Sequence, residues 1–164
     1  MGQRLIGMLK PFFQWLAATD VFAKVGPKVV PRMDRVAHRL TGGRLVMSDG
    51  LIPTLILTTT GAKSGEPRVA PLACLPEDGD GGGFLVVGSN FGRAHHPAWS
   101  GNLLKTPEAT VSFRGREIPV TGRLLTGEER AEAWSRLLRI WPVYDRYTEK
   151  SGRDIRVFRL TPRS

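Results

Sequence analysis

The segment 58–68 carries side chains that could bind an anion. Its sequence is Thr-Thr-Thr-Gly-Ala-Lys-Ser-Gly-Glu-Pro-Arg, with two glycines four positions apart. Such glycines allow backbone angles in which several N–H groups point at one ligand atom. Lys63 adds a point charge, Ser64 a hydroxyl donor and Arg68 a planar guanidinium that fits a phosphate or a carboxylate. An ordinary β-hairpin turn has the same composition, so this segment alone leaves both interpretations open.

A second motif lies downstream and consists of Gly88-Ser89-Asn90-Phe91-Gly92, followed by His95-His96-Pro97-Ala98-Trp99-Ser100-Gly101-Asn102-Leu103. Together with the upstream Thr-Thr-Gly-x-Lys-Ser-Gly-x-x-Arg, this motif resembles the deazaflavin-dependent nitroreductase family, whose members include F420-dependent quinone reductases. The order and spacing agree from about Leu51 to the C-terminus, and the ending Val157–Pro162 is similar to the family's last strand. Each motif alone would be a weak signal, whereas the combination is specific.

The resemblance implies a split β-barrel, related to flavin-binding barrels, that binds reduced coenzyme F420 (F420H2). It also implies hydride transfer to an organic acceptor such as a quinone, a nitroaromatic compound or an enone. In such proteins the turn grips the phosphate and polyglutamate tail of the cofactor, a role that carries over to Lys63, Ser64 and Arg68. The residues that would line the deazaflavin ring are Pro71, Leu72, Val87, Gly88, Ser89 and Asn90, and those that would close over it are Trp99, Asn102 and Leu103.

The residue types agree with this expectation. A polyanionic tail suits two cations in a glycine-rich turn. A flat and partly apolar ring suits an aliphatic strand and an indole such as Trp99. Ser89 offers backbone and hydroxyl donors beside the reacting face. For Trp99, plain core packing is an equally good explanation, because most tryptophans are largely buried.

Three aromatic residues at a spacing of three indicate where the acceptor would bind. The family places such aromatics after its last helix, and Trp141, Tyr144 and Tyr147 match the spacing. The family often has tyrosine at the first position, so Trp141 puts the acceptor in doubt more than the cofactor. Donors from Tyr144, Tyr147 or Ser89 could stabilise the charge that develops on an acceptor oxygen, with Tyr144 the first candidate for a catalytic residue. Packing of an amphipathic helix would explain the two tyrosines equally well.

Two other reactive residue types predict no further site. His95 and His96 are adjacent, so their side chains point apart, and no cysteine or carboxylate completes a metal-binding set. Cys74 is the only cysteine and lies in an apolar run, so we expect a core residue rather than a nucleophile. A single thiol fits a reducing, cytoplasmic compartment.

These residues must be positioned by a mainly β domain. β-branched and apolar runs predict strands at Thr54–Thr60, Arg68–Leu75, Phe84–Val87, Val111–Phe113, Glu117–Leu125 and Ile155–Leu160. Strands in meander order with few helices favour an α+β, mainly antiparallel barrel over an alternating βαβ sheet. The chain has neither a Rossmann fingerprint nor a Walker phosphate loop.

Two helices are expected to interrupt the sheet. The first spans about Pro97 to Lys105. The second begins at Thr126, which forms a capping box with Glu129, and Pro142 ends or kinks it. The predicted core face of the second helix consists of Ala131, Trp134, Leu137, Leu138 and Trp141.

The N-terminal part differs in composition from the rest. Residues 1–45 are predicted to form amphipathic basic helices at 3–18 and 27–40, ahead of a cofactor-binding barrel at 46–164, all within one domain of 164 residues. The first 44 residues carry eight Lys or Arg and two Asp, within a net charge of +9. This pattern fits peripheral contact with the inner face of the cell membrane, and it also fits packing on the barrel. Neither a signal peptide nor a spanning helix is expected.

Two rival functions remain open on the sequence, and a third is disfavoured. The same barrel could bind FMN or haem, and an F420 protein could be a carrier without catalysis. The positive charge would also allow a nucleic-acid-binding module, but the sequence has no platform of aromatic and basic strand residues, so no nucleic-acid partner is expected. The physiological acceptor and the oligomeric state are not determined by the sequence.

Overall fold

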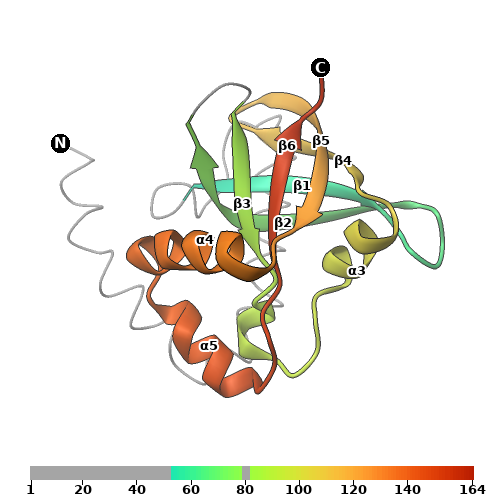
Figure 1. Cartoon of the computed structure of the whole chain (residues 1–164). Coiled ribbons are helices and arrows are strands. Elements are labelled where there is room, and N and C mark those ends of the chain that lie inside the picture. The colour runs from blue at the N-terminus through green and yellow to red at the C-terminus, as the bar shows by residue number, and fades with distance from the viewer. Residues whose placement is uncertain (1–52, 79–81) are drawn as a thin grey trace, which may run out of the picture.

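The computed structural model describes residues 53–78 and 82–164, and within these ranges the chain forms a closed barrel of six antiparallel strands (Figure 1). The strands are β1 (Thr54–Thr60), β2 (Pro67–Glu77), β3 (Gly83–Val87), β4 (Glu108–Phe113), β5 (Arg116–Leu124) and β6 (Val157–Pro162). The helical elements are the 3-10 helix η1 (Asn90–Gly92), α3 (Ala98–Lys105), α4 (Gly127–Ile140) and α5 (Val143–Ser151). The N-terminal helices predicted within 1–45 lie outside the described residues.

The predicted antiparallel, mainly β barrel is confirmed, but the simple meander is wrong. The strands follow the order β1-β2-β3-β6-β5-β4, because β3 pairs with β6 and β4 closes the barrel against β1. Three predicted strands also have wrong limits. β2 continues to Glu77, which pairs with Gly83, β4 begins at Glu108, which pairs with Thr121, and β6 runs from Val157 to Pro162, which pairs with Val120. Pairing with the neighbouring strands of the barrel therefore sets these ends, and local composition does not.

Side chains on one face of each strand fill the barrel. Leu55 and Leu57 of β1 are fully buried there, and the lone Cys74 is buried as predicted. α3 closes one end of the barrel, because its Trp99 packs edge-on against Phe158 of β6 with ring centroids 5.6 Å apart. Burial of aromatic and aliphatic side chains of this size supplies much of the stabilisation of a small domain.

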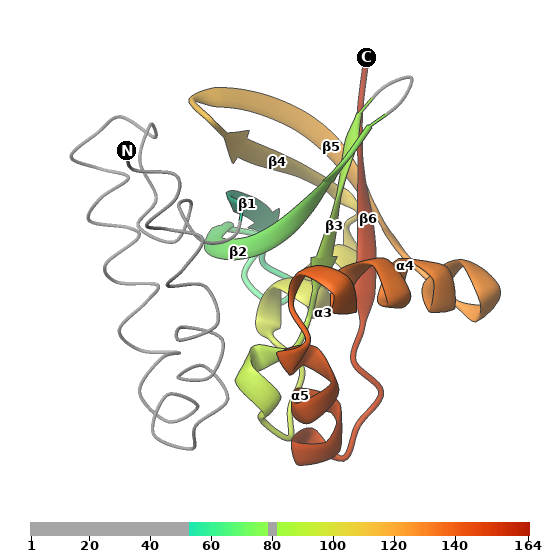
Figure 2. The same cartoon turned by 90° about the vertical axis from the view of Figure 1, so that its left-hand side faces the viewer.

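α4 packs on the outside of the barrel against β6, and α5 lies beyond that end of the barrel next to η1 (Figure 2). A second apolar cluster joins both helices to residues of β3 and β6. The predicted break at Pro142 is confirmed, since α4 ends at Ile140 and α5 begins at Val143. The predicted core face of α4 is confirmed at Leu137, which is buried, and at Trp134, Leu138 and Trp141, which pack against the same cluster, but it is wrong at one residue. Ala131 is exposed, whereas Ala133 and Leu137, four residues apart, are buried.

The predicted capping box is wrong in its contacts. Thr126 occupies the N-cap position of α4, but its side chain makes no capping hydrogen bond. Glu129 instead pairs with Arg123 and Arg159, which approach from β5 and β6. Tertiary ion pairs have therefore replaced the local cap that the spacing indicated.

A partly buried carboxylate ties α4 to the barrel. Glu77 of β2 accepts hydrogen bonds from Arg136 at 2.7 Å and from Arg159 at 2.7 Å. Burial alone would raise the pKa of Glu77, but the bonds from the two guanidiniums outweigh it and lower the pKa below its ordinary value. The carboxylate is therefore charged at neutral pH and fixes the orientation of α4.

No helix in the described ranges is long and apolar enough to cross a membrane.

Candidate functional site

Residues 61–66, which join β1 to β2, form a tight turn that we call the glycine turn. The Gly61 N–H donates to the Glu66 carbonyl at 2.8 Å, and the Gly65 N–H donates to the Gly61 carbonyl at 2.8 Å. Gly65 has a φ of +72°, which favours glycine. A Cβ at position 61 would lie 2.5 Å from Ser64 Oγ and 3.1 Å from the Glu66 carbonyl oxygen. The turn is therefore built around its two glycines.

The glycine turn presents cations to solvent. Lys63, Ser64 and Arg68 are all exposed, and an Arg68 Nη2–H donates to Ser64 Oγ at 3.1 Å. Among the residues described, Lys63 makes no ion pair. A third cation, which the sequence did not reveal, is Lys105 at the end of α3, whose Nζ donates to the Ala62 carbonyl at 2.6 Å. The structure thus brings three positive side chains to one exposed turn, as an anion site requires.

Asn102 anchors the glycine turn to α3. Its Oδ1 accepts from the Ala62 N–H at 2.9 Å, and its Nδ2 donates to Thr59 Oγ1 at 3.0 Å. Both ends of the buried amide are engaged within the protein. Trp99 and Leu103 of the same helix are 7% and 1% exposed and belong to the barrel core. The contacts of these three residues are those of anchoring and packing groups.

We expect Asn102→Ala to lower the free energy of unfolding by about 1–3 kcal/mol, because it leaves the partly buried Ala62 N–H without its partner. The Ala62 amide should also exchange its hydrogen faster. Denaturant unfolding and hydrogen exchange measure the two effects. Leu104→Ala, at an exposed position of the same helix, is the control and should change neither. If Asn102→Ala were as stable as the wild type, the hydrogen bonds of the Asn102 side chain would not hold the glycine turn.

Residues 88–93, which follow β3 and include η1, form a strained loop that we call the Gly88 loop. Asn90 and Phe91 have positive φ values of 46° and 55°, which non-glycine residues rarely adopt. The Asn90 side-chain amide donates to the His95 carbonyl at 3.1 Å. Ser89 Oγ, in contrast, makes no hydrogen bond within the described part of the chain. Of the predicted ring-lining polar groups, the Ser89 hydroxyl is therefore available to a ligand.

The adjacent histidines have different partners. His95 Nδ1 lies 3.0 Å from Asn90 Nδ2, whereas His96 Nδ1 lies 2.9 Å from Arg153 Nη1. Within residues 53–78 and 82–164, no group of three or more His, Cys, Asp or Glu side chains could hold a metal ion. His95 thus contacts Asn90 within the preceding loop, whereas His96 contacts Arg153, which follows α5.

Tyr144 and Tyr147 are buried on the inner face of α5. Their exposed fractions are 6% and 5%, and their ring centroids lie 6.4 Å apart. Tyr144 also packs on Trp134 at 5.9 Å, and its hydroxyl makes no hydrogen bond to any other described residue. Burial raises the pKa of Tyr147 to about 12 and also raises that of Tyr144. Both phenols therefore remain protonated donors at neutral pH.

Tyr144 and Tyr147 differ in what they contact. Tyr144 borders a cavity of about 10 Å³ together with Cys74 and Trp141, room for at most one water. Tyr147 packs on the Gly88 loop, with its ring centroid 6.5 Å from that of Phe91. A Cβ on Gly92 would come within 3.2 Å of the Tyr147 ring. Tyr147 thus packs against the Gly88 loop, whereas Tyr144 lies beside the small cavity.

The predicted strand residues do not share one surface. Leu72 packs against the barrel interior, whereas Val87 packs in the outer cluster beneath α4 and α5. Pro71 pairs with Ile56 of β1 and is partly exposed. In both Figure 1 and Figure 2 the other parts follow one another as the glycine turn, α3, η1 and α5. The site residues therefore form a path along one end of the barrel rather than a single cavity.

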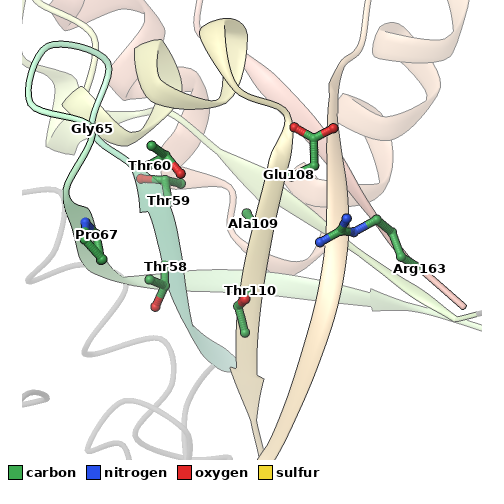
Figure 3. Close-up of a pocket in the computed structure, with 9 residues that line it drawn as sticks. All are labelled: Thr58, Thr59, Thr60, Gly65, Pro67, Glu108, Ala109, Thr110 and Arg163. Atoms are coloured by element: carbon green, nitrogen blue, oxygen red, sulfur yellow. The ribbon is translucent and has the colours of Figure 1, made fainter.

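A hollow of about 200 Å³ lies beside the glycine turn (Figure 3). Its lining consists of Thr58, Thr59, Thr60, Gly65, Pro67, Glu108, Ala109, Thr110 and Arg163. None of the side chains predicted from sequence to bind a ligand lines this hollow, and its threonines carry no signal that distinguishes them from ordinary strand residues.

Comparison with known proteins identifies relatives over most of the chain. A family model described as F420H(2)-dependent quinone reductase matches residues 30–162. The Mycobacterium tuberculosis protein Rv3178, provisionally named for the same activity, is 32% identical over 112 residues, which are 68% of this chain and 92% of the relative. The F420H(2)-dependent quinone reductase Rv1261c of the same species is 29% identical over 137 residues, covering 79% and 81%. The solved structure of an F420-H2 dependent reductase (FDR-A) is 37% identical with a TM-score of 0.59, covering 66% of this chain and 93% of that one.

Proposed function

This chain belongs to the F420H2-dependent quinone reductase family, and we propose that it reduces a quinone-like acceptor with F420H2 as the reductant, at the end of the barrel between the glycine turn and α5. The observation that carries this proposal is the combination of an exposed cationic turn with two hydroxyls that lack partners among the described residues. One part suits an anionic cofactor tail, and the other suits an acceptor oxygen.

The glycine turn fits the anionic part of F420. Lys63 and Arg68 are exposed, and Lys105 is tied to the same turn by its bond to the Ala62 carbonyl. Ser64 Oγ accepts from Arg68 and from the Glu66 N–H at 3.2 Å, so its own proton remains free to be donated. These groups would bind phosphate and carboxylate oxygens by charge-assisted hydrogen bonds.

F420H2 supplies a hydride when it is bound, and the protein contributes position and electrostatics. The Gly88 loop lies between the glycine turn and α5 in Figure 1 and would border the reacting face. Ser89 Oγ could donate to the cofactor or the acceptor there. Trp99 and Leu103 would contribute indirectly, because their packing in the barrel core keeps α3, and with it the glycine turn, in place.

Tyr144 is the group we propose to act on the acceptor. Reduction places negative charge on an acceptor oxygen, and a neutral phenol aimed at that oxygen lowers the barrier. The raised pKa keeps Tyr144 protonated, and its burial limits competition from water. Trp141 borders the same small cavity as Tyr144, so its indole would shape the surroundings of that phenol.

The proposal is tested by mixing the purified protein with F420H2 and following cofactor oxidation spectroscopically with a panel of quinones, nitroaromatics and enones. Quinone-dependent oxidation is expected, and the panel orders the three acceptor classes. Binding of F420 without oxidation by any acceptor would support the carrier instead. Binding of FMN or haem in place of F420 would overturn the cofactor assignment. The predicted membrane contact depends on residues outside the described ranges, and it stays a prediction, as does the predicted cytoplasmic location.

A further inference from the structure

Arg153, just beyond the C-terminus of α5, binds both ends of the Gly88 loop. Its Nη2 donates to the carbonyls of Gly88 at 3.0 Å and Ser89 at 2.9 Å. Its Nε donates to the Arg93 carbonyl at 3.0 Å, and Nη1 lies 2.9 Å from His96 Nδ1. One partly buried guanidinium thus contacts both ends of the loop and the histidine beyond it.

These contacts need the shape of an arginine. A guanidinium directs five N–H donors outward in one plane, whereas a lysine ammonium is a compact charge that cannot reach four acceptors spread around that plane. The loop itself is unfavourable, because Asn90 and Phe91 both adopt positive φ angles. Such a conformation persists only where surrounding contacts fix it, and Arg153 supplies three hydrogen bonds to its backbone.

We propose that Arg153 is a positioning residue of the reductase: its guanidinium fixes the Gly88 loop so that the Ser89 hydroxyl faces the reaction. This inference rests on the proposed function, because it assumes that the loop borders the bound cofactor. Arg153 acts through the loop, since the four hydrogen bonds of its guanidinium are all to protein groups. Removal of the fork should therefore impair turnover more than it impairs cofactor binding, which depends on the glycine turn.

The bond to His96 makes this arrangement depend on pH. The groups that act on His96 are Arg156 and Arg153, which disfavour its protonation, together with Asp154, which favours it, and His95, which disfavours it. Burial is the largest effect, and the net result lowers the pKa of His96 below 6.5. At neutral pH Nδ1 therefore accepts from Arg153. Protonation in acid removes that acceptor and places two cations side by side, so the loop is fixed above the His96 pKa and loosened below it.

The main test compares Arg153→Lys with Arg146→Lys, a matched change at an exposed position of α5. Without cofactor, hydrogen exchange of the peptide 88–96 should rise about tenfold or more in Arg153→Lys, as expected for the loss of charge-assisted bonds. With F420H2 and a quinone, kcat should fall about tenfold while the Kd for F420 stays within about threefold. Arg146→Lys should match the wild type in every measurement.

A second variant keeps the inference falsifiable if Arg153→Lys does not fold. His96→Asn places an amide oxygen near the position of Nδ1 but does not titrate. Wild-type kcat should decline as the pH falls through the lowered pKa of His96, whereas His96→Asn should lack that decline. Unchanged loop exchange, faster exchange with unchanged kcat, or identical pH profiles would each overturn the inference. Failure of the wild type to oxidise F420H2 would defeat the proposed function, and the exchange measurement would still decide whether Arg153 fixes the loop.

Discussion

The double variant Lys63→Ala/Arg68→Ala is expected to weaken F420 binding by about 100-fold or more at low ionic strength. A charge-assisted hydrogen bond contributes about 1.5–3 kcal/mol, and two such losses exceed the roughly 2.8 kcal/mol that corresponds to 100-fold. Both side chains are exposed at the glycine turn, and Arg68 already bonds to Ser64, so the site is preorganised. Fluorescence titration with oxidised F420 measures the effect.

Salt dependence separates a local anion site from a general effect of charge. Exposed charges are screened with a Debye length of about 10 Å at 0.1 M salt, so wild-type affinity should fall as salt rises, and that of the double variant should respond less. Arg139→Ala/Arg146→Ala removes the same net charge from exposed positions of α4 and α5. Equal weakening in this control pair, or a salt-independent loss in the first pair, would contradict the anion site.

Tyr144→Phe is expected to lower kcat with a quinone by about 100-fold while leaving the Kd for F420 unchanged. Removal of one preorganised donor to a developing oxyanion costs about 10²–10³ in rate. Stability should be unchanged or slightly higher, because the deleted hydroxyl has no hydrogen-bond partner in the described residues and is buried. Stopped-flow oxidation of F420H2 measures the rate, and thermal unfolding measures the stability.

Two further variants assign the hydroxyl that acts. Tyr147→Phe keeps the ring that packs on the Gly88 loop, and Ser89→Ala removes the loop hydroxyl. A larger loss of kcat in either of these than in Tyr144→Phe would transfer the role to that residue. Wild-type turnover in Tyr144→Phe would remove Tyr144 from the mechanism. Burial raises the pKa of Tyr144, so deprotonation of this phenol would not explain a fall in activity near pH 10. Such a fall would come from another group, and it should therefore also occur in Tyr144→Phe.

We predict that Trp141 bears on the acceptor more than on the cofactor. It lies at the C-cap of α4 and lines a small cavity with Tyr144 and Cys74, at the position where the resemblance to the family led us to expect a tyrosine. An indole is larger than a phenol and offers only one N–H donor, so the space next to Tyr144 differs in shape and polarity from that of a tyrosine-bearing relative. We therefore expect the preference among quinones, nitroaromatics and enones to depend on Trp141.

Features that depend on neighbours along the chain could be predicted from the sequence. The β-branched run at Thr54–Thr60 and the break at Pro142 lie where they were predicted, since strand propensity and the missing proline N–H act locally. The glycine turn and its exposed cations were predicted for the same reason, because two glycines and the residues between them already specify a tight bend. The motif order also predicted the family that the comparisons found.

The contacts between residues far apart in the chain could not be predicted, because they form only when the barrel closes. β3 pairs with β6, Lys105 reaches the glycine turn, Asn102 anchors that turn instead of standing open to a ligand, and Arg153 binds a loop about 60 residues earlier in the chain. Glu129 of α4 does not form the expected cap but pairs with two arginines, Arg123 of β5 and Arg159 of β6. Hydrogen bonds and ion pairs depend on distance in space, and closing the barrel brings these groups together at separations that no local pattern encodes.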